Sequence, residues 1–207
     1  DFSCLRVASG YVLAEPAALV GVRDALWYVP KRTLGAGSPM GRASQGDAYY
    51  VAPNPPFGAV FTYHLAEELT TARAARRKAD GEVDGATFPG FDALAAEEDE
   101  LAPAVLLTVR DADGHVVRTL EGPTKAGFQR VAWNLRYPPV DAWQRDAQEE
   151  EWDDGSEDGA LAAPGTYSVS LALRVGDEVT DIGGSRAFEV RPLGGGALEG
   201  ATPAVVA

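Results

Sequence analysis

Cysteine and histidine are scarce in this chain, and their scarcity excludes several kinds of chemistry. One cysteine, Cys4, occurs in 207 residues, which rules out an internal disulfide framework and a cysteine-based zinc cage. We interpret Cys4 as a small apolar packing residue. The two histidines, His64 and His115, lie far apart without a G-x-S-x-G motif. They do not indicate a catalytic triad, and we expect them on the surface or on a polar strand face.

Basic residues and long apolar runs are also lacking. Lysine and arginine number 18 against 31 acidic residues, which gives a net charge of −13. Nucleic acids and anionic membrane surfaces bind clustered bases, so we expect neither as the main partner. No run approaches the roughly 20 apolar residues that a membrane span requires, so we expect no span. The chain opens at Asp1 without a signal-peptide pattern, and we expect a mature product or a piece of a longer protein.

Short alternating patterns are abundant and predict an all-β protein. The chain contains 23 glycines and 14 prolines, which favours short strands and turns over long helices. Apolar residues alternate with polar ones around residues 58–65, 105–110, 129–137 and 167–175, the period of strands with one buried face. Such strands need a second layer to cover that face. The sequence therefore predicts an antiparallel β-sandwich, with Trp133, Tyr137 and Tyr167 in its core.

Changes in composition divide the chain into a central domain and less regular parts. Residues 57–193 hold the predicted strands, and they are interrupted by two insertions. The first, residues 66–102, is helix-prone in two stretches, with Asp92 as a candidate N-cap. The second, residues 139–163, includes eight carboxylates and no base between positions 146 and 158. We expect residues 1–56 to include a linker or arm, and residues 194–207 to form a flexible tail.

Acidic residues are the first candidates for catalysis or metal binding. A glycosidase needs two carboxyl groups about 5 to 10 Å apart across a sugar cleft, whereas nearly all the acidic residues here fall in predicted loops. Asp111-x-Asp113-Gly114 resembles the start of a calcium loop, but His115 resumes a strand directly, so the later oxygen ligands are missing. A hairpin turn with a positive φ at Gly114 is favoured there. We therefore predict no catalytic residue, metal or cofactor, although the acidic insertion leaves diffuse cation binding open.

Three residues remain as candidates for contact with a partner. Trp143 and Trp152 lie in the polar, acidic second insertion, where a tryptophan anchors a protein partner or stacks on a sugar unless it packs back onto the sandwich. Arg136 lies at the end of a predicted strand, on the face opposite Trp133. It is placed to bridge to the acidic insertion or to the upstream linker, and we favour a structural ion pair.

The predicted strands also resemble a known family. G-A-V-F-T-Y-H-L, L-T-V-R-D-A-D-G-H-V-V-R-T-L, A-G-F-Q-R-V-A-W-N-L-R-Y-P and A-P-G-T-Y-S-V-S-L resemble the C-terminal domain of propeller proteins with BNR/WD40/YVTN-type repeats. Those proteins are related to sortilin (VPS10) and are often labelled glycosyl hydrolases. The same order resembles the Ig-like domain of the flagellar hook-capping family. D-F-S-C-L-R and V-R-D-A-L-W-Y-V-P look like the exit from a last propeller blade and its linker.

The resemblance implies an Ig-like or FlgD-like accessory domain of an extracytoplasmic propeller protein. The expected function is non-catalytic contact with the upstream propeller or with another protein domain. The alternative is a carbohydrate-binding module that serves a glycoside hydrolase. A third possibility is that the domain completes an active site built mostly by the propeller, whose repeats are not in this sequence.

Overall fold

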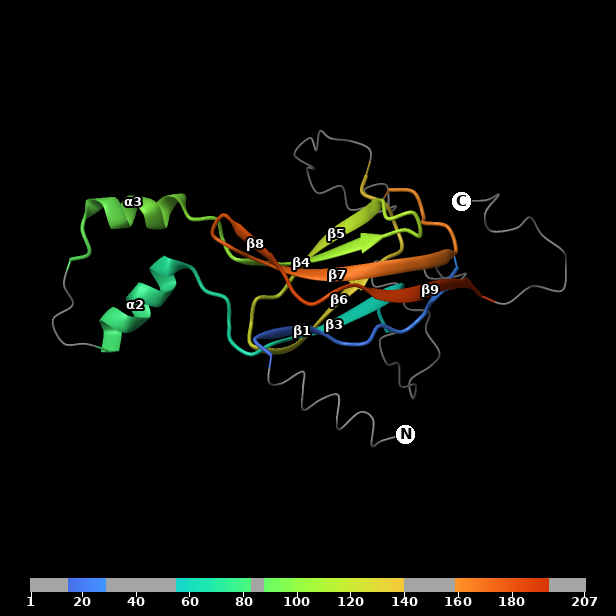
Figure 1. The fold of residues 1–207 in the computed structure, drawn as a ribbon, viewed down its shortest axis with the longest axis horizontal. Coiled ribbons are helices and arrows are strands. Elements are labelled where there is room, and N and C mark those ends of the chain that lie inside the picture. The colour runs from blue at the N-terminus through green and yellow to red at the C-terminus, as the bar shows by residue number, and fades with distance from the viewer. Residues whose placement is uncertain (1–14, 29–54, 83–87, 140–158, 194–207) are drawn as a thin grey trace, which may run out of the picture.

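The computed structural model describes four parts of the chain, residues 15–28, 55–82, 88–139 and 159–193. Predictions that fall between or beyond these parts, including the tail 194–207 and most of the arm 1–56, lie outside the described residues. The described parts are rich in β-structure and form two sheets (Figure 1). The predicted β-rich class is therefore confirmed.

The smaller sheet has three strands in the order β1-β3-β6, all antiparallel. Its strands are β1 (Ala17–Leu19), β3 (Ala59–Leu65) and β6 (Gly127–Trp133). β3 and β6 pair along their whole lengths. Gly58, just before β3, has a φ of 98°, and a Cβ there would lie 1.9 Å from the carbonyl oxygen of Trp133. Only glycine allows this close approach of the two strands.

The larger sheet has the order β2-β9-β7-β4-β5, with β8 paired to β7 beside this path. Its strands are β2 (Ala25–Trp27), β4 (Ala104–Arg110), β5 (Val116–Gly122), β7 (Gly165–Val175), β8 (Glu178–Asp181) and β9 (Arg186–Pro192). β2 runs parallel to β9, and the other pairs are antiparallel. The long strand β7 is at the centre, because it pairs with β4 on one side and with β9 and β8 on the other.

Side chains from both sheets form one hydrophobic cluster. The Phe61 ring of β3 lies 5.5 Å from the Phe188 ring of β9, and the Trp133 ring of β6 lies 5.4 Å from the Tyr167 ring of β7. The predicted burial of Trp133 and Tyr167 is confirmed. The same prediction for Tyr137 is wrong, because its side chain is 38% exposed.

The chain direction changes at Leu135, which explains the error at Tyr137. β6 ends at Trp133, and Leu135 has a φ of 58°, unusual for a residue with a bulky side chain. This backbone conformation turns the fully buried Leu135 side chain into the core. The alternation of buried and exposed side chains therefore ends at Leu135, although the sequence pattern continues to Tyr137.

The N-terminal part of the chain contributes a strand to each sheet. β1 pairs with β3, and β2 pairs with β9. Ala17 and Ala25 are buried in the common cluster. The described part of the predicted arm is therefore integrated into the sheets. Three-residue strands are too short for a period-2 pattern to separate them from a linker.

The first insertion contains two helices, as predicted, and they form a helical hairpin. Helix α2 (Ala72–Glu82) and helix α3 (Phe91–Asp99) extend from one end of the sheets (Figure 1). The N-cap of α3 is Gly90, without a side-chain cap, and Asp92 lies within the first turn. The predicted capping role of Asp92 is therefore wrong. Neither helix is long and apolar enough to cross a membrane, as judged over the described residues.

Candidate functional site

The turn between β4 and β5 brings Asp111, Asp113 and His115 together. Their potential ligand atoms all lie within 4.8 Å of one another. Asp111 Oδ1 accepts hydrogen bonds from the backbone N–H groups of Asp113 (3.0 Å) and His115 (2.8 Å), and Oδ2 lies 3.3 Å from His115 Nδ1. The N–H of Gly114, whose φ is 86°, donates to the carbonyl of Asp111. These are the contacts of a tight turn, which confirms the predicted hairpin.

Electrostatics at this turn follow from the same contacts. Partial burial acts to raise the pKa of the Asp111 carboxyl. Hydrogen bonds and charge from His115 outweigh that effect and hold the pKa below its ordinary value. The imidazole of His115 is exposed, as predicted. The carboxylate of Asp111 is thus already used to hold the backbone of the turn, and we assign the group a structural role.

His64 is more buried than the sequence predicts. It is 6% exposed, so of the two predicted positions, the surface and the polar strand face, the surface position is wrong. The imidazole lies 4.9 Å from the Phe128 ring on the neighbouring strand β6, and its Nδ1 atom is buried without a hydrogen-bond partner. Alternation assigned His64 correctly to the side opposite Phe61 and Tyr63. Alternation alone could not show that other residues cover His64 on this side of the strand.

Arg136 joins the two borders of the second insertion. Its guanidinium Nη1 donates to the carbonyl oxygen of Gly159 at 2.9 Å. Arg136 and Leu161 also form an antiparallel β-bridge. Gly159 leaves no space for a side chain, because a Cβ would lie 2.4 Å from the carbonyl oxygens of Tyr137 and Pro138. The two borders are therefore in direct contact.

Backbone hydrogen bonds complete this connection. The N–H of Tyr137 donates to the carbonyl of Ala160 at 2.9 Å, and the N–H of Ala162 donates to the carbonyl of Leu135 at 2.7 Å. We refer to residues 135–137 and 159–163 together as the clamp. Ala162 is fully buried and belongs to the common cluster. The last residues of the predicted insertion are therefore part of the core.

Two tryptophans of the sheets donate hydrogen bonds to the backbone of the clamp. Trp133 Nε1 donates to the carbonyl oxygen of Arg136 at 2.9 Å, and Trp27 Nε1 donates to that of Ala162 at 2.7 Å. A buried indole N–H needs an acceptor, and here each acceptor is a backbone carbonyl of the clamp. The clamp is thus connected to a strand from each sheet.

A tyrosine holds the same region from the start of β7. Tyr167 Oη donates to the carbonyl oxygen of Ala163, four residues upstream, at 2.6 Å. Burial, with smaller effects from Tyr137 and Asp111, raises the pKa of Tyr167 to about 12. The hydroxyl therefore keeps its proton at neutral pH and remains a donor. The sequence signal is A-A-P-G-T-Y, in which a tyrosine follows a proline–glycine corner, although the pattern by itself predicts only the start of a strand.

The predicted site residues are therefore only partly located. Arg136 belongs to the clamp, whereas Trp143 and Trp152 lie outside the described residues. The chain between the two halves of the clamp, from Pro138 to Asp158, includes both tryptophans and the acidic stretch. The ion pair predicted for Arg136 would involve the acidic stretch 146–158 or the linker, and the acidic stretch and most of the linker also lie outside the described parts.

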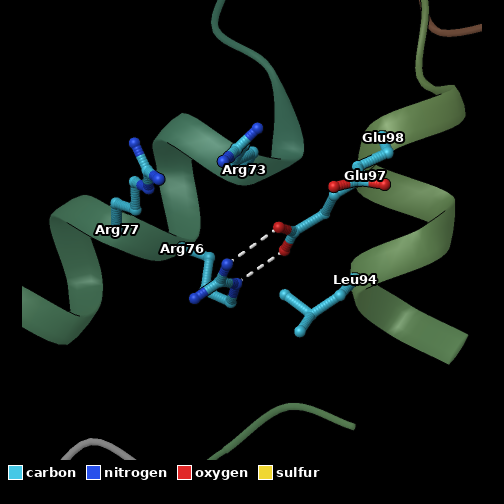
Figure 2. A pocket seen from close by; sticks show the side chains of 6 residues that line it. All are labelled: Arg73, Arg76, Arg77, Leu94, Glu97 and Glu98. Carbon is cyan, nitrogen blue, oxygen red and sulfur yellow. Dashed lines mark hydrogen bonds and ion pairs between the residues drawn. The ribbon is translucent and has the colours of Figure 1, made fainter. Parts of the chain in front are cut away.

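The helical hairpin forms a second group of charged residues (Figure 2). Arg76 of α2 contacts both carboxylate oxygens of Glu97 of α3, with Nε–Oε1 at 2.6 Å and Nη2–Oε2 at 2.8 Å. The hydrogen bonds that Arg76 donates to Glu97 are the main cause of a raised Arg76 pKa, and the same bonds lower the pKa of Glu97. A hollow of about 230 Å³ lies between the helices, and it is lined by Arg73, Arg76, Arg77, Leu94, Glu97 and Glu98.

Comparison of the chain with known protein families, with curated proteins and with solved structures gives no match.

Proposed function

We propose that this chain is an Ig-like, FlgD-like β-sandwich that serves as a non-catalytic interaction domain of a larger, extracytoplasmic propeller protein. Its partner is the propeller or another protein domain. In this proposal the partner binds the segment held by the clamp, with Trp143 and Trp152 as anchors and Arg136 as the residue that positions them.

Strand order supports the Ig-like assignment. Immunoglobulin-type domains place strands C, F and G in one sheet, with C′ beside C in the variable type, and strands A, B and E in the other. In this chain β5-β4-β7-β9 matches the order C′-C-F-G, and β1-β3-β6 matches A-B-E. Many Ig-type domains also carry a tyrosine near the start of strand F that hydrogen-bonds to upstream backbone. Tyr167 makes such a bond to Ala163 at the start of β7.

The clamp is the observation that carries the functional proposal. Binding residues are commonly placed on loops that a rigid scaffold positions. Here the scaffold is specific, because a guanidinium, two indoles and a β-bridge hold the two ends of one segment. That segment contains two tryptophans, and tryptophan is among the residues that contribute most to protein interfaces. Fixed ends reduce the conformational entropy that the segment loses on binding.

Substitution of the two tryptophans tests the proposal. We expect Trp143→Ala and Trp152→Ala to weaken binding of the propeller or partner domain by about tenfold or more, as for interface anchors. Arg130→Ala, at an exposed position of β6, is the control and should bind as the unmodified chain does. Binding is measured by calorimetry with the separately produced neighbouring domain of the same protein.

Three outcomes would contradict the proposal. Equal binding by the tryptophan variants would remove the segment from the interface. Saturable binding on a glycan array that both variants lose would favour the carbohydrate-binding alternative. Loss of the full-length protein's turnover on deletion of residues 57–193, in a protein that still folds, would support a part in catalysis.

A further inference from the structure

The helical hairpin of α2 and α3 plays no part in the function proposed for the clamped segment. It extends from the sheets (Figure 1), and α2 and α3 pack mainly on each other. Its base is fixed, because Leu69 packs against the common cluster and donates its N–H to the carbonyl of Thr124 at 3.0 Å. On the other side, Arg174 Nη2 donates to the carbonyl of Ala102 at 3.3 Å. The hairpin is therefore presented to solvent from a defined position.

Helix α2 concentrates positive charge in an acidic protein. Residues 69–79 contain four bases and no carboxylate, in a chain of net charge −13. Of these bases, Arg76 is engaged by Glu97 and Asp80. Arg73, Arg77 and Lys78 are exposed and make no hydrogen bond or ion-pair contact within the described residues. Arg73 and Arg77 act on Glu97 only at longer range.

Helix stability does not account for these bases. The N-terminal end of a helix carries a partial positive charge and favours acidic residues, and the C-terminal end favours basic ones. Helix α2 has Arg73 in its first turn and Asp80 near its end, and it has no acidic residue in the first turn and no basic residue in the last. The arrangement weakens the isolated helix, and it leaves two arginines side by side on one flank (Figure 2).

Exposed aromatic rings lie on the same hairpin. Phe88 is 60% exposed and Phe91 is 81% exposed, and their rings meet edge to face at 5.1 Å. Helix α3 contains no buried residue. Arginine and aromatic residues are enriched in protein interfaces, and burial of such a ring against a partner removes apolar surface from water, which favours binding. The hairpin thus combines unpaired positive charge with apolar surface.

We propose that the α2–α3 hairpin is a second docking surface, which binds an acidic segment of a partner protein that also carries an apolar side chain. Arg73 and Arg77 bind carboxylates, and the rings of Phe88 and Phe91 cover the apolar side chain. The net negative charge of the chain repels such a partner at long range. Recognition therefore depends on the short-range arginine contacts, and binding weakens as salt increases.

A labelled peptide tests this surface directly. The probe is a short fluorescein-labelled peptide of glutamates with a central tryptophan, titrated with the full chain and followed by fluorescence anisotropy. We expect saturable binding that the double variant Arg73→Ala/Arg77→Ala weakens about tenfold. Arg76 is left unchanged, so that the contact between the two helices is retained, and circular dichroism checks the fold. Arg130→Ala is the matched control and should bind as the unmodified chain does.

Charge reversal gives a second measurement. The variant Arg73→Glu/Arg77→Glu should lose the glutamate peptide and bind its lysine counterpart instead. Equal binding of a peptide with glutamine in place of glutamate would overturn the proposal, as would absence of binding. Equal competition by a single-stranded oligodeoxynucleotide would show a general polyanion site and would also overturn it. Trp143→Ala and Trp152→Ala should leave peptide binding unchanged, which separates this surface from the clamped segment.

Discussion

The clamp borders one insertion into the sheets and the helical hairpin forms part of the other, yet the two are held by different forces. The clamp is held by buried indole and phenol hydrogen bonds and by a fully buried alanine. The hairpin is held mainly by one partly buried arginine–glutamate pair and by bonds at its base. Fully buried, satisfied polar groups add more to stability than an ion pair that water still reaches. The clamp should therefore unfold only together with the core, whereas the hairpin should unfold locally while the sheets remain folded.

The largest expected effect is the loss of Trp133. Trp133→Ala removes a fully buried ring that packs on Tyr167 and Phe188, together with the indole donor to the clamp. Such substitutions cost about 3–5 kcal/mol, measured as the free energy of unfolding in urea. Leu26→Ala, at an exposed position, is the comparison. Similar destabilisation by the two variants would show that the core is not centred on Trp133.

Removal of the Tyr167 hydroxyl should give the next largest effect. Tyr167→Phe leaves the ring in the core and deprives the Ala163 carbonyl of its donor. The expected loss is about 1–3 kcal/mol, because a buried acceptor is left without a partner. Tyr137→Phe, on a partly exposed ring, should change the free energy of unfolding by much less. An unchanged value for Tyr167→Phe would mean that the corner hydrogen bond does not stabilise the fold.

Alkaline pH should destabilise the protein through two tyrosines. Burial raises the pKa values of Tyr63 and Tyr167 from 10.0 to about 12. Since the folded-state values are the higher ones, this stability is complete below pH 10 and is lost as pH rises from 10 to 12. The free energy of unfolding, followed against pH, should fall over that interval, and Tyr63→Phe/Tyr167→Phe should flatten the fall. A profile that is identical in the double variant would contradict the assignment.

Arg136→Ala should loosen the clamp with a smaller effect on overall stability. The substitution removes the hydrogen bond to Gly159 and leaves the backbone bonds of Tyr137 and Ala162 in place. We expect a loss of about 1–2 kcal/mol and faster hydrogen exchange at these two amides. Arg136→Lys retains the charge but not the planar donor geometry, so it should restore only part of the protection.

The smallest global effect is expected in the hairpin. Arg76→Ala should leave the urea midpoint of the sheets unchanged and should speed hydrogen exchange in α2 and α3. The bond from Arg76 lowers the pKa of Glu97, so the contribution of the pair is present above the unfolded pKa and is lost as pH falls through the folded one. Glu97→Gln should remove this acid dependence. A large loss of global stability would show that the hairpin is part of the core.

The sequence was sufficient for the elements with clear periodicity. The alternation of Tyr167, Val169 and Leu171 identified β7, and the turn chemistry of Asp111 and Gly114 identified the hairpin of β4 and β5, because both signals are local. The Ala- and Arg-rich stretch likewise identified α2, since these residues favour helices.

Non-local features could not be predicted in the same way. Nothing near Leu135 signals its positive φ, because the conformation is imposed by the fit of its side chain into the core. The partners of Arg136 and Trp27, Gly159 and Ala162, lie 23 and 135 residues away in the chain. The burial of His64 depends on what covers its strand, which alternation does not report. The structure of the clamp is therefore determined by contacts between residues that lie far apart in the sequence.

Native-state hydrogen exchange is the most direct test of the clamp. The amides of Tyr137 and Ala162, which donate across the clamp, are compared with that of Ala75, which donates to Thr71 within the hairpin. We expect the first two to exchange only through global unfolding, with a free energy close to that from urea, and Ala75 to exchange through local opening. Exchange of Tyr137 and Ala162 as fast as that of Ala75 would contradict a rigid clamp.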